Sequence, residues 1–563
     1  MTRRTCSLIV LVAWSAAPAG EVSTDGSLGP RVTLPGPQRV VPASLGQQRG
    51  GNLFHSFQKL DIDRGESVRF TGPSVVRNVL ARVTGGSASR INGLLASDID
   101  GANLFLINPA GIVFGEKARL EVSGAFVATT ADDVKLADGG KFAARTPGDS
   151  VLTAAPPTAF GFLGPSAGGI QLRGVKDSPA KLTVAETKGV SLVAGDIQMD
   201  RGQLRAPGGW VTLATVAGAG EVMLSTGNPG MVQSVATPPA GQLRADRSLI
   251  DASGVGVGLS GGTISLRTGT LILRNTFIDS STVFGPDPGA PLSIEATRQM
   301  KLEGGRVRTG SGLAGDAGDV TVRTGLLELL DGGVLGSLTF GLGNTGDVDV
   351  TADRIVLAGA NEQFGSTLGT SASFGTGNAG NVTLRCDSLL VADDARVRAD
   401  TLSQGAGGRI DVRADRIVLA GDGAGETGGI VGSSLGDGPT AGNGGTVSIV
   451  AKSLRIERDA SVIVGSNGGG DAGVVDITAD EVVLNSADAP SPASITAISI
   501  SSTSFGGDSG TVKIKAGTFR MLNASLVTAL TVTEGNGGNV SIEADRVRVD
   551  QSLILAGTGG LAP

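Results

Sequence analysis

The C-terminal half of the chain repeats a short pattern of apolar and polar positions. A Gly-x-x-Gly turn, often with Asn or Asp second, precedes a strand pattern in which apolar and polar residues alternate, as in GDAGDVTV from Gly315 and GNGGNVSI from Gly535. The turns start at positions 259, 287, 315, 343, 377, 405, 442, 470, 507 and 535, of which the first two lack the opening Gly and are placed by alignment. The recurring spacing is 28 residues, with insertions of 6 or 9, which is typical of a structural repeat with variable loops.

Each repeat contains three apolar positions of strand character. The first is an alternating pair such as Val348 and Val350, and the second follows seven residues later, as at Ile355 and Leu357. A third lies about fifteen residues after the first, and we place it at Val397, Val462, Val527 and Leu555. Because side chains alternate between faces with a period of two, this pattern predicts three short strands per repeat and no helix.

A single repeat is too small to bury its own apolar side chains. Stacking one repeat on the next pairs each strand with its equivalent, and this pairing satisfies the backbone N–H and C=O groups. The sequence therefore predicts an all-β parallel solenoid with three faces. Each coil is expected to add about 4.8 Å along the axis, or roughly 48 Å for the ten coils.

The N-terminal half is organised around Asn103–Gly115, which reads NLFLINPAGIVFG. Asn108, Pro109 and Gly111 match a type I turn, in which Pro sets φ at the second corner. The flanking residues are too continuously apolar for a hairpin with one wet face. We therefore expect two strands buried in a parallel stack.

Several motifs in this half occur in the order that one known family shows. They are NLFHSF (Asn52–Phe57), RVTGG (Arg82–Gly86), INGLL (Ile91–Leu95), NLFLINPAGIVFG (Asn103–Gly115), FVATTADD (Phe126–Asp133) and the longer stretch Leu192–Val222. Together they resemble the secretion domain of filamentous-haemagglutinin-like exoproteins, the cargo of two-partner secretion. The family turn usually reads NPNG, and here Ala110 replaces the second Asn.

The resemblance implies a right-handed parallel β-helix with a capped N-terminal secretion domain at residues 20–255, followed by repetitive coils at 256–563. It also implies export, unfolded, through the periplasm of a diderm bacterium and recognition by an outer-membrane β-barrel with POTRA domains. The residues that it assigns to the secretion motif are Asn108, Pro109 and Gly111 of the turn, with Asn103, Asn52, Phe54 and Phe57 from the preceding motifs.

The first 19 residues read as a cleaved export signal. Arg3 and Arg4 precede an apolar run, and Ala17-Pro18-Ala19 supplies a small-x-small cleavage site. The run is too short to span a bilayer, which takes about 20 apolar residues. After cleavage Cys386 would be the sole cysteine, so we expect no intramolecular disulfide.

Composition and charge narrow the class of function. Gly is 90 of 563 residues and Tyr is absent, while apolar residues still reach 40%, which favours many short strands over disorder. The formal charge of −7 gives no basic face for nucleic acid. Adhesion through loops inserted between coils, such as Gly421–Gly429, is the function that remains most consistent with these features.

The candidate chemical sites favour structural explanations. The GDAGD turns are 28 or more residues apart, whereas calcium-binding nonapeptide repeats recur every nine, so we expect Asn, Asp and Gly to serve left-handed backbone there and no metal site. Asp132–Asp133 and Asp393–Asp394 are interpreted as solvated corners. His55 is the single histidine and is expected to be a partly buried strand residue, and Cys386 a small core residue.

The sequence thus predicts a secreted, non-enzymatic surface protein without a cofactor, acting as an adhesin or haemagglutinin-like structural binding protein. Two alternatives stay open. A β-helical polysaccharide-active enzyme would need outward carboxylates and aromatics on one face, and few aromatics follow residue 162. The stalk of a contact-dependent toxin would carry a distinct C-terminal domain. The receptor and the transporter are not identified by the sequence.

Overall fold

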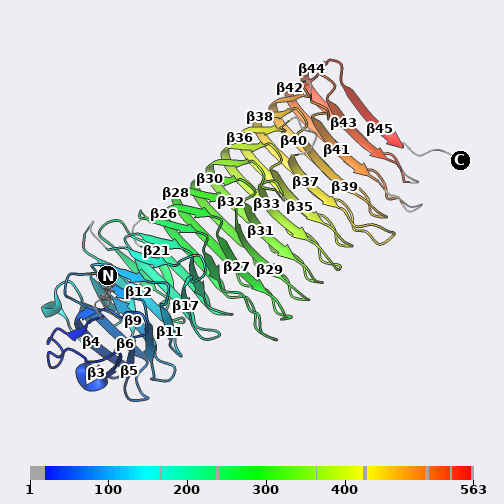
Figure 1. Ribbon diagram of the computed structural model, residues 1–563. Coiled ribbons are helices and arrows are strands. Elements are labelled where there is room, and N and C mark those ends of the chain that lie inside the picture. Colours follow the sequence, from blue (N-terminus) through cyan, green and yellow to red (C-terminus); the bar gives the residue numbers. More distant parts are fainter. Residues whose placement is uncertain are drawn as a thin grey trace, which may run out of the picture.

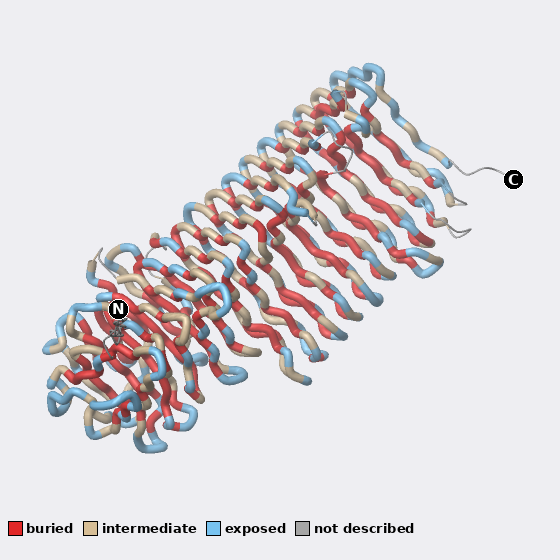
Figure 2. The backbone as a smooth tube through the Cα atoms, viewed as in Figure 1, coloured by how far each residue is buried: buried red, intermediate tan, exposed pale blue. Residues whose placement is uncertain are grey.

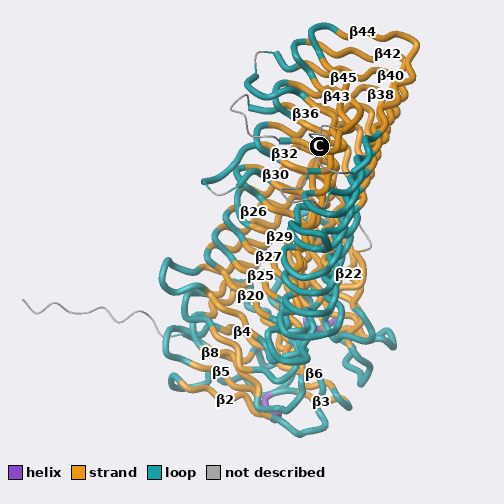
Figure 3. Tube along the Cα trace, turned by 90° about the vertical axis from the view of Figure 1, so that its right-hand side faces the viewer, coloured by secondary structure: helices purple, strands orange, loops and turns teal. Residues whose placement is uncertain are grey.

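The computed structural model describes residues 20–164, 168–235, 240–362, 364–422, 428–487, 489–500, 506–532 and 535–558. The predicted export signal lies outside these residues. The described chain forms one elongated stack of β-coils with its N-terminal part at one end (Figure 1). Strands make the walls of this stack and loops lie at its corners (Figure 3).

In the N-terminal part, each coil contributes separate short strands to three columns. The first column is β4 (Asn52–Leu60), β6 (Asn78–Val83), β9 (Asn103–Ile107), β12 (Phe126–Thr129), β18 (Gly189–Ala194) and β21 (Trp210–Thr215). The second column is β7 (Ser89–Ile91), β10 (Ile112–Phe114), β16 (Ile170–Arg173), β19 (Ile197–Asp200) and β24 (Gln242–Asp246). Neighbours within each column pair in parallel.

The third column closes each coil. In the N-terminal part it contains β2 (Gln38–Pro42), β5 (Ser67–Thr71), β8 (Leu94–Ser97), β11 (Arg119–Glu121), β17 (Ala180–Thr183), β20 (Gly202–Arg205) and β25 (Leu249–Asp251). It continues as the short strands of the repeats: β27 (Phe277–Thr282), β29 (Arg306–Ser311), β31 (Val334–Thr339), β33 (Thr367–Ala372), β35 (Arg396–Thr401), β37 (Gly429–Ser434), β39 (Ser461–Ser466), β41 (Ser494–Ser499), β43 (Leu526–Thr531) and β45 (Leu553–Thr558).

The first two columns merge at β26 (Thr263–Arg274). The first half of β26 pairs with β21 and its second half with β24. Every later coil keeps this long strand: β28 (Leu292–Glu303), β30 (Val320–Leu330), β32 (Val348–Ala358), β34 (Val382–Ala392), β36 (Arg409–Ala420), β38 (Thr446–Glu457), β40 (Val474–Asn485), β42 (Thr511–Leu522) and β44 (Asn539–Val549). The parallel β-helix is confirmed, and in the repeats the first two of its three predicted strands form one strand that turns a corner.

The register of the repeats is the predicted one. Val320 lies opposite Val348, and Val348 opposite Val382, so the spacings of 28 and 34 residues both place like side chains on one another. The third apolar position was predicted wrongly in one coil. Ile554, and not Leu555, pairs with Val527, because β44 ends at Val549, opposite Met521, one residue earlier than β42 does, and both corners are three residues long.

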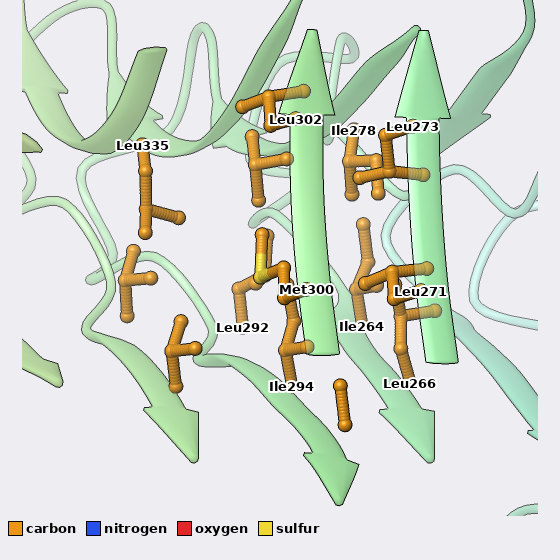
Figure 4. Packing of buried hydrophobic residues seen from close by; sticks show 14 of the residues in the cluster. Ile264, Leu266, Leu271, Leu273, Ile278, Leu292, Ile294, Met300, Leu302 and Leu335 are labelled. Carbon is orange, nitrogen blue, oxygen red and sulfur yellow. The ribbon is translucent and has the colours of Figure 1, made fainter. Parts of the chain in front are cut away.

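One apolar core fills the stack from end to end. It runs from Val22 in the N-terminal cap to Val527 near the far end, and Figure 4 shows its side chains packed layer on layer. The burial pattern of the backbone repeats from coil to coil (Figure 2). Strands β1 (Val22–Thr24) and β3 (Gln47–Arg49) pair antiparallel with β4 and cover the N-terminal end.

A second sheet lies outside the helix in the N-terminal part. It contains β13 (Asp133–Leu136), β14 (Lys141–Ala143), β15 (Pro157–Phe162), β22 (Gly220–Leu224) and β23 (Val232–Val235), all paired antiparallel. Two short 3-10 turns complete the secondary structure, η1 (Ala43–Leu45) and η2 (Pro147–Asp149). The stretch from 140 to 180, which is rich in Pro and Gly, therefore contributes strands both to this sheet and to the coils.

The second sheet explains why the first-column strands are apolar on both faces. Phe54, Phe105 and Val127 point outward from the helix and pack with Phe142 and Phe160 of the added sheet. Strand β9 is consequently buried almost throughout. The apolar run in β9 is therefore continuous because this strand lies between two cores and is buried on both faces.

The Gly-x-x-Gly turns of the repeats stack on one another along one corner. A Cβ on Gly343 would lie 2.1 Å from the carbonyl oxygen of Gly315, and a Cβ on Gly377 would lie 2.0 Å from that of Gly343. None of these three glycines has a positive φ. The expectation of left-handed backbone was therefore wrong, and glycine is required because successive backbones approach too closely for a side chain.

The polar residue of each turn also has a different role from the predicted one. The backbone N–H of Asn344 donates to Oδ1 of Asp316 at 2.7 Å, and that of Asn378 donates to Oδ1 of Asn344 at 2.9 Å. Each of these side chains thus accepts a hydrogen bond from a backbone N–H of the following coil. This role does not depend on a left-handed backbone. Asn and Asp suit this column because both carry an acceptor oxygen.

Candidate functional site

The Asn108–Gly111 turn is held rigidly between coils. The N–H of Gly111 donates to the carbonyl of Asn108 at 3.0 Å, and the N–H of Ala110 donates to Oδ1 of Asn108 at 3.0 Å. The Asn108 amide donates to the carbonyl of Ser87 and to Oγ of Ser89, both at 3.0 Å. Asn108 is fully buried and therefore links its own turn to the previous coil.

Only the middle of this turn faces solvent. Pro109 is half-buried and Ala110 is exposed, and together they border a groove of about 290 Å³ that Arg145 also lines. Gly111 has a φ of +120° and would bring a Cβ to 3.2 Å from the carbonyl oxygen of Gly169. Glycine at this position is therefore fixed by the backbone conformation.

Asn52 and Asn103 belong to a ladder of three stacked asparagines at the start of the first column. The Asn103 amide donates to Oδ1 of Asn78 at 2.9 Å, and the Asn78 amide donates to Oδ1 of Asn52 at 2.9 Å. The ends are satisfied by backbone groups, since Asn52 donates to the carbonyl of Ala155 at 2.7 Å and Oδ1 of Asn103 accepts from the N–H of Ala125 at 3.0 Å. Sequence reasoning missed Asn78.

Phe54 and Phe57 point to opposite sides of β4 and serve two different cores. Phe54 lies edge-on to Phe142 of the added sheet, with ring centroids 5.0 Å apart. Phe57 lies edge-on to Phe70 inside the helix at 6.1 Å. Both rings are fully buried, so in the folded domain neither can contact another protein.

The predicted motif residues do not form one surface. The asparagine ladder lies at the start of β9 and the turn follows its end, with the strand between them. The structure brings Asn52 and Asn103 together through Asn78, and it brings Asn108, Pro109 and Gly111 together in the turn. Of the seven residues, Pro109 and Asn103 alone are part-exposed, and the other five are buried.

His55 is a core residue. It is fully buried between Phe57 and Phe70, with ring centroids 6.2 and 5.3 Å away. Burial lowers the pKa of His55 to about 4, so the ring is neutral near pH 7. The prediction of a strand residue is confirmed, since His55 lies in β4, and its burial is more complete than predicted.

A buried arginine that the sequence reasoning missed joins four segments. Nε of Arg82 donates to Oγ of Ser56 at 2.7 Å, and its two Nη groups donate to the carbonyl of Ala143, to Oγ of Ser150 at 2.7 Å and to Oγ of Ser27 at 2.9 Å. Burial lowers the pKa of Arg82 to about 10, which still leaves it charged. It fastens the N-terminal cap and the added sheet to the first coils.

The paired acids were interpreted wrongly in one case. Asp132 and Asp133 are buried, not solvated: Asp132 accepts from Nε of Arg145 and, at 2.6 Å, from the N–H of Leu163. Burial raises the pKa of Asp133. Asp393 is exposed and Asp394 half-buried at a corner, close to the expectation for that pair.

Cys386 is the remaining candidate for chemistry. Cys386 is half-buried against the core, and burial raises the pKa of its thiol to about 12, which suppresses the reactive thiolate. Within the described residues, no group of three or more His, Cys, Asp or Glu side chains is placed to hold a metal ion. Nor does any helix in the described part have the length and apolarity to cross a membrane.

Comparison with known proteins matches the N-terminal part to one family. Residues 22–266 match the family described as the TPS secretion domain. A segment of 87 residues is 36% identical to the heme/hemopexin-binding protein of Haemophilus influenzae. This segment covers 16% of the present chain and 9% of that protein.

A solved structure is also similar to the chain. The crystal structure of the HMW1 secretion domain from Haemophilus influenzae aligns with a TM-score of 0.47 and 16% identity, over 82% of this chain and 98% of that one. The family match ends inside β26, the strand at which the first two columns merge. Residues 22–266 therefore match a secretion domain of the two-partner secretion type.

Proposed function

We propose that the chain is exported across the outer membrane by a POTRA-containing β-barrel and acts at the cell surface, or after release, as an adhesin or haemagglutinin-like structural binding protein. The observation that carries the proposal is the secretion-domain match at residues 22–266, continued without a break in the core by a long repetitive solenoid. An outer-membrane transporter partner follows from the domain type.

The two parts of the chain have different tasks in this proposal. Residues 20–255 address the chain to its transporter and provide a capped, folded first coil. Residues 256–563 then add coil by coil outside the cell, each templated on the edge of the previous one. The merging of two columns at β26 supports a boundary in this region, because the coil geometry changes there.

The motif residues act before the domain is folded. Asn52, Phe54, Phe57 and Asn108 are all buried in the folded domain, so the transporter can contact their side chains only in the unfolded or partly folded chain. Once outside, the same side chains complete the ladder, the turn and the two cores. We propose that the chain is released from the transporter as it folds, because the side chains that the transporter contacts become buried in the folded domain.

Substitution at the turn separates contact from folding. Asn108→Ala removes three hydrogen bonds of a buried side chain, so it should lower the thermal midpoint of the purified domain, and it should also abolish export if the transporter reads this side chain. Asn78→Ala, which also loses hydrogen bonds of a buried amide, is the control for stability: if it reduces export as much as Asn108→Ala does, Asn108 acts through the folded domain and the contact proposal fails. Ala110→Asn, which restores the usual family turn at an exposed position, is the matched control and should leave the thermal midpoint unchanged.

The export route has its own test. Cells that express the chain with a barrel encoded beside it should release the protein or display it, and cells without the barrel should retain it in the periplasm. Export that is independent of any such barrel would overturn this part of the proposal.

Inserted loops supply a regular array for binding. The corner between long and short strand is three residues long after β30, but eight residues long at 359–366, 421–428 and 486–493. These long corners occur in every second coil, so they recur on one corner about every 9.6 Å. Residues 423–427 of the second of these loops lie outside the described residues.

Shortening the loops tests the adhesive role. Replacing 359–366, 421–428 and 486–493 by the three-residue turn Asp-Gly-Gly of Asp331–Gly333 should leave export and thermal midpoint unchanged and reduce attachment to target cells at least tenfold. Unchanged attachment would show that the loops are not the binding surface.

A further inference from the structure

An exposed apolar stripe follows the corner at which the short strands end. It consists of large apolar side chains one to three residues beyond these strands, from β27 to β43, each 38–65% exposed: Phe284, Leu313, Phe340, Leu342, Phe374, Leu402, Leu435, Ile500 and Val532. Figure 2 shows the exposed turns that follow one another along this edge. Exposed apolar side chains scattered singly are ordinary, but a continuous row of them marks an interaction site.

The backbone holds the stripe in register. The N–H of Phe340 donates to the carbonyl of Ser311 at 2.9 Å, and the N–H groups of Leu402 and Leu435 donate to the coil before each of them at 2.7 Å. The parallel ladder thus continues one residue past the strand ends, so Phe340, Leu402, Leu435, Ile500 and Val532 hold equivalent positions in a stack whose successive coils are about 4.8 Å apart. The remaining members of the stripe lie one or two residues further along the same corner. The rings of Phe340 and Phe374 are 6.4 Å apart on successive coils.

The middle of the stripe is hollowed. A groove of about 380 Å³ lies between the corners of two successive coils, and its lining includes Phe374 and Leu402. Side chains of a matching apolar row could enter it. The coil that contains β39 contributes no apolar side chain to the stripe. The residue directly beyond β39 is Asn467, which is polar and exposed.

The charges beside the stripe exclude an anionic membrane surface as its partner. Asp316, Asp347 and Asp471 lie in the turns just beyond the stripe, and the corner segments 312–319, 340–347, 373–381, 402–408, 435–445 and 467–473 contain no Lys or Arg. A row of carboxylates repels anionic lipid headgroups. The partner must therefore present apolar groups without a dense negative charge opposite these turns.

We propose that the apolar stripe is a self-association surface on which a second copy of this chain docks side by side, with the two solenoid axes parallel. A second copy presents the same row at the same period, so every apolar side chain meets an equivalent one across a two-fold axis. In the parallel arrangement the two acidic turn columns lie on opposite sides of the contact. In the antiparallel arrangement they would face each other and repel.

The size of the stripe indicates a reversible contact. Nine short strands from β27 to β43 give a row about 43 Å long, and a width of about 10 Å gives roughly 430 Å² per copy, about half the ~800 Å² of a standard stable interface. Pairing is then concentration-dependent, and it becomes extensive where many copies are displayed together.

Sedimentation equilibrium of the purified chain tests the proposal. Wild type should pass from monomer to dimer as concentration rises, and the triple variant Phe340→Gln, Phe374→Gln, Leu402→Gln should raise the dissociation constant at least tenfold with an unchanged thermal midpoint. The matched control changes three exposed apolar residues outside the stripe: Leu163→Gln, Val175→Gln, Val257→Gln. Equal dimerisation of all three proteins, or none in wild type at millimolar concentration, would overturn the proposal.

Cysteine cross-linking tests the orientation in a Cys386→Ser background. In parallel pairing, Phe284→Cys alone and Val532→Cys alone should each form disulfide-linked dimers under mild oxidation, because each position meets itself. Cross-links that form only when the two variants are mixed would overturn the parallel arrangement. Flotation of the monomeric chain with phosphatidylcholine vesicles, lost in the triple variant, would assign the stripe to a lipid surface and contradict self-association.

Discussion

Asn78 is the residue on which the asparagine ladder depends, because its amide is both donor and acceptor to neighbours in two other coils. Asn78→Ala leaves Oδ1 of Asn52 and an amide hydrogen of Asn103 without partners in a largely buried setting. We expect the free energy of unfolding to fall by about 1–3 kcal/mol. Urea denaturation measures this loss, and exposed Asn228→Ala should change it by less than about 0.5 kcal/mol.

His55 makes stability depend on pH in a defined window. The pKa of His55 is about 4 in the folded protein against 6.5 in the unfolded chain, because burial disfavours the charged ring. The unfolded state therefore binds more protons between these values, so this contribution is complete above about pH 6.5 and is lost as pH falls towards 4. The full loss is about 3 kcal/mol.

The measurement is a comparison of wild type with His55→Gln. Carboxylates titrate in both proteins, but the chain has a single histidine, so the difference in unfolding free energy between them isolates His55. We expect the advantage of wild type at pH 7 to shrink by about 3 kcal/mol on going to pH 4. A difference that is constant over this range would show that the ring is not held neutral.

Some of these residues could be predicted from the sequence and others could not. The ladder does leave a signal, since Asn-Leu-Phe at Asn52, Asn-Val-Leu at Asn78 and Asn-Leu-Phe at Asn103 repeat at nearly equal intervals. Arg82 leaves none, because its four partners come from segments as far apart as Ser27 and Ser150. Only the fold brings these segments together.

At the scale of the element, the turn glycines are predicted to be irreplaceable for a steric reason. Gly377→Ala would place its Cβ 2.0 Å from the carbonyl oxygen of Gly343, so two coils must separate. We expect the free energy of unfolding to fall by about 1–3 kcal/mol, as for other overpacked sites. Gly256→Ala is the control, since its nearest contact would be an ordinary 3.6 Å.

The turns show where pattern reasoning stops. Spacing predicted the register of the repeats because apolar pairs such as Val348/Val350 and Val382/Leu384 must face one core, and one-residue errors would expose them. The reason for the glycines could not be read in the same way. Glycine in a sequence indicates either a positive φ or a close backbone approach, and these two are distinguished by the neighbouring coil, which a single repeat does not show.

At the scale of the whole molecule, the core is one stack in which each coil contacts only its neighbours. Changes in distant coils should then be additive, whereas changes in register neighbours should couple. Leu213 and Ile417 are many coils apart, while Ile417 lies directly opposite Leu454. The repeat spacing could not predict the added N-terminal sheet, because the strands of that sheet pair antiparallel and lie outside the stacked coils.

Stacking in register predicts that a whole coil can be removed and a fraction of one cannot. Deleting residues 384–411, 28 in all, joins Thr383 to Val412 and places Val412 at the inward position of Leu384 and Ile417 at that of Leu389. The joined strand then lies on β32 in the native register, and every later strand keeps its own neighbour. Deleting residues 384–410, one fewer, instead puts Asp411 at that fully buried position and turns Val412 outward. A buried, unpaired carboxylate costs several kcal/mol, and the junction lies inside a strand, where no loop can accommodate a shift of one residue.

We therefore expect the 28-residue deletion to keep its strand content by circular dichroism and a thermal midpoint within a few degrees of wild type. The 27-residue deletion should lose cooperative unfolding of the C-terminal coils. Equal behaviour of the two deletions would mean that the coils are not held by side chains in register.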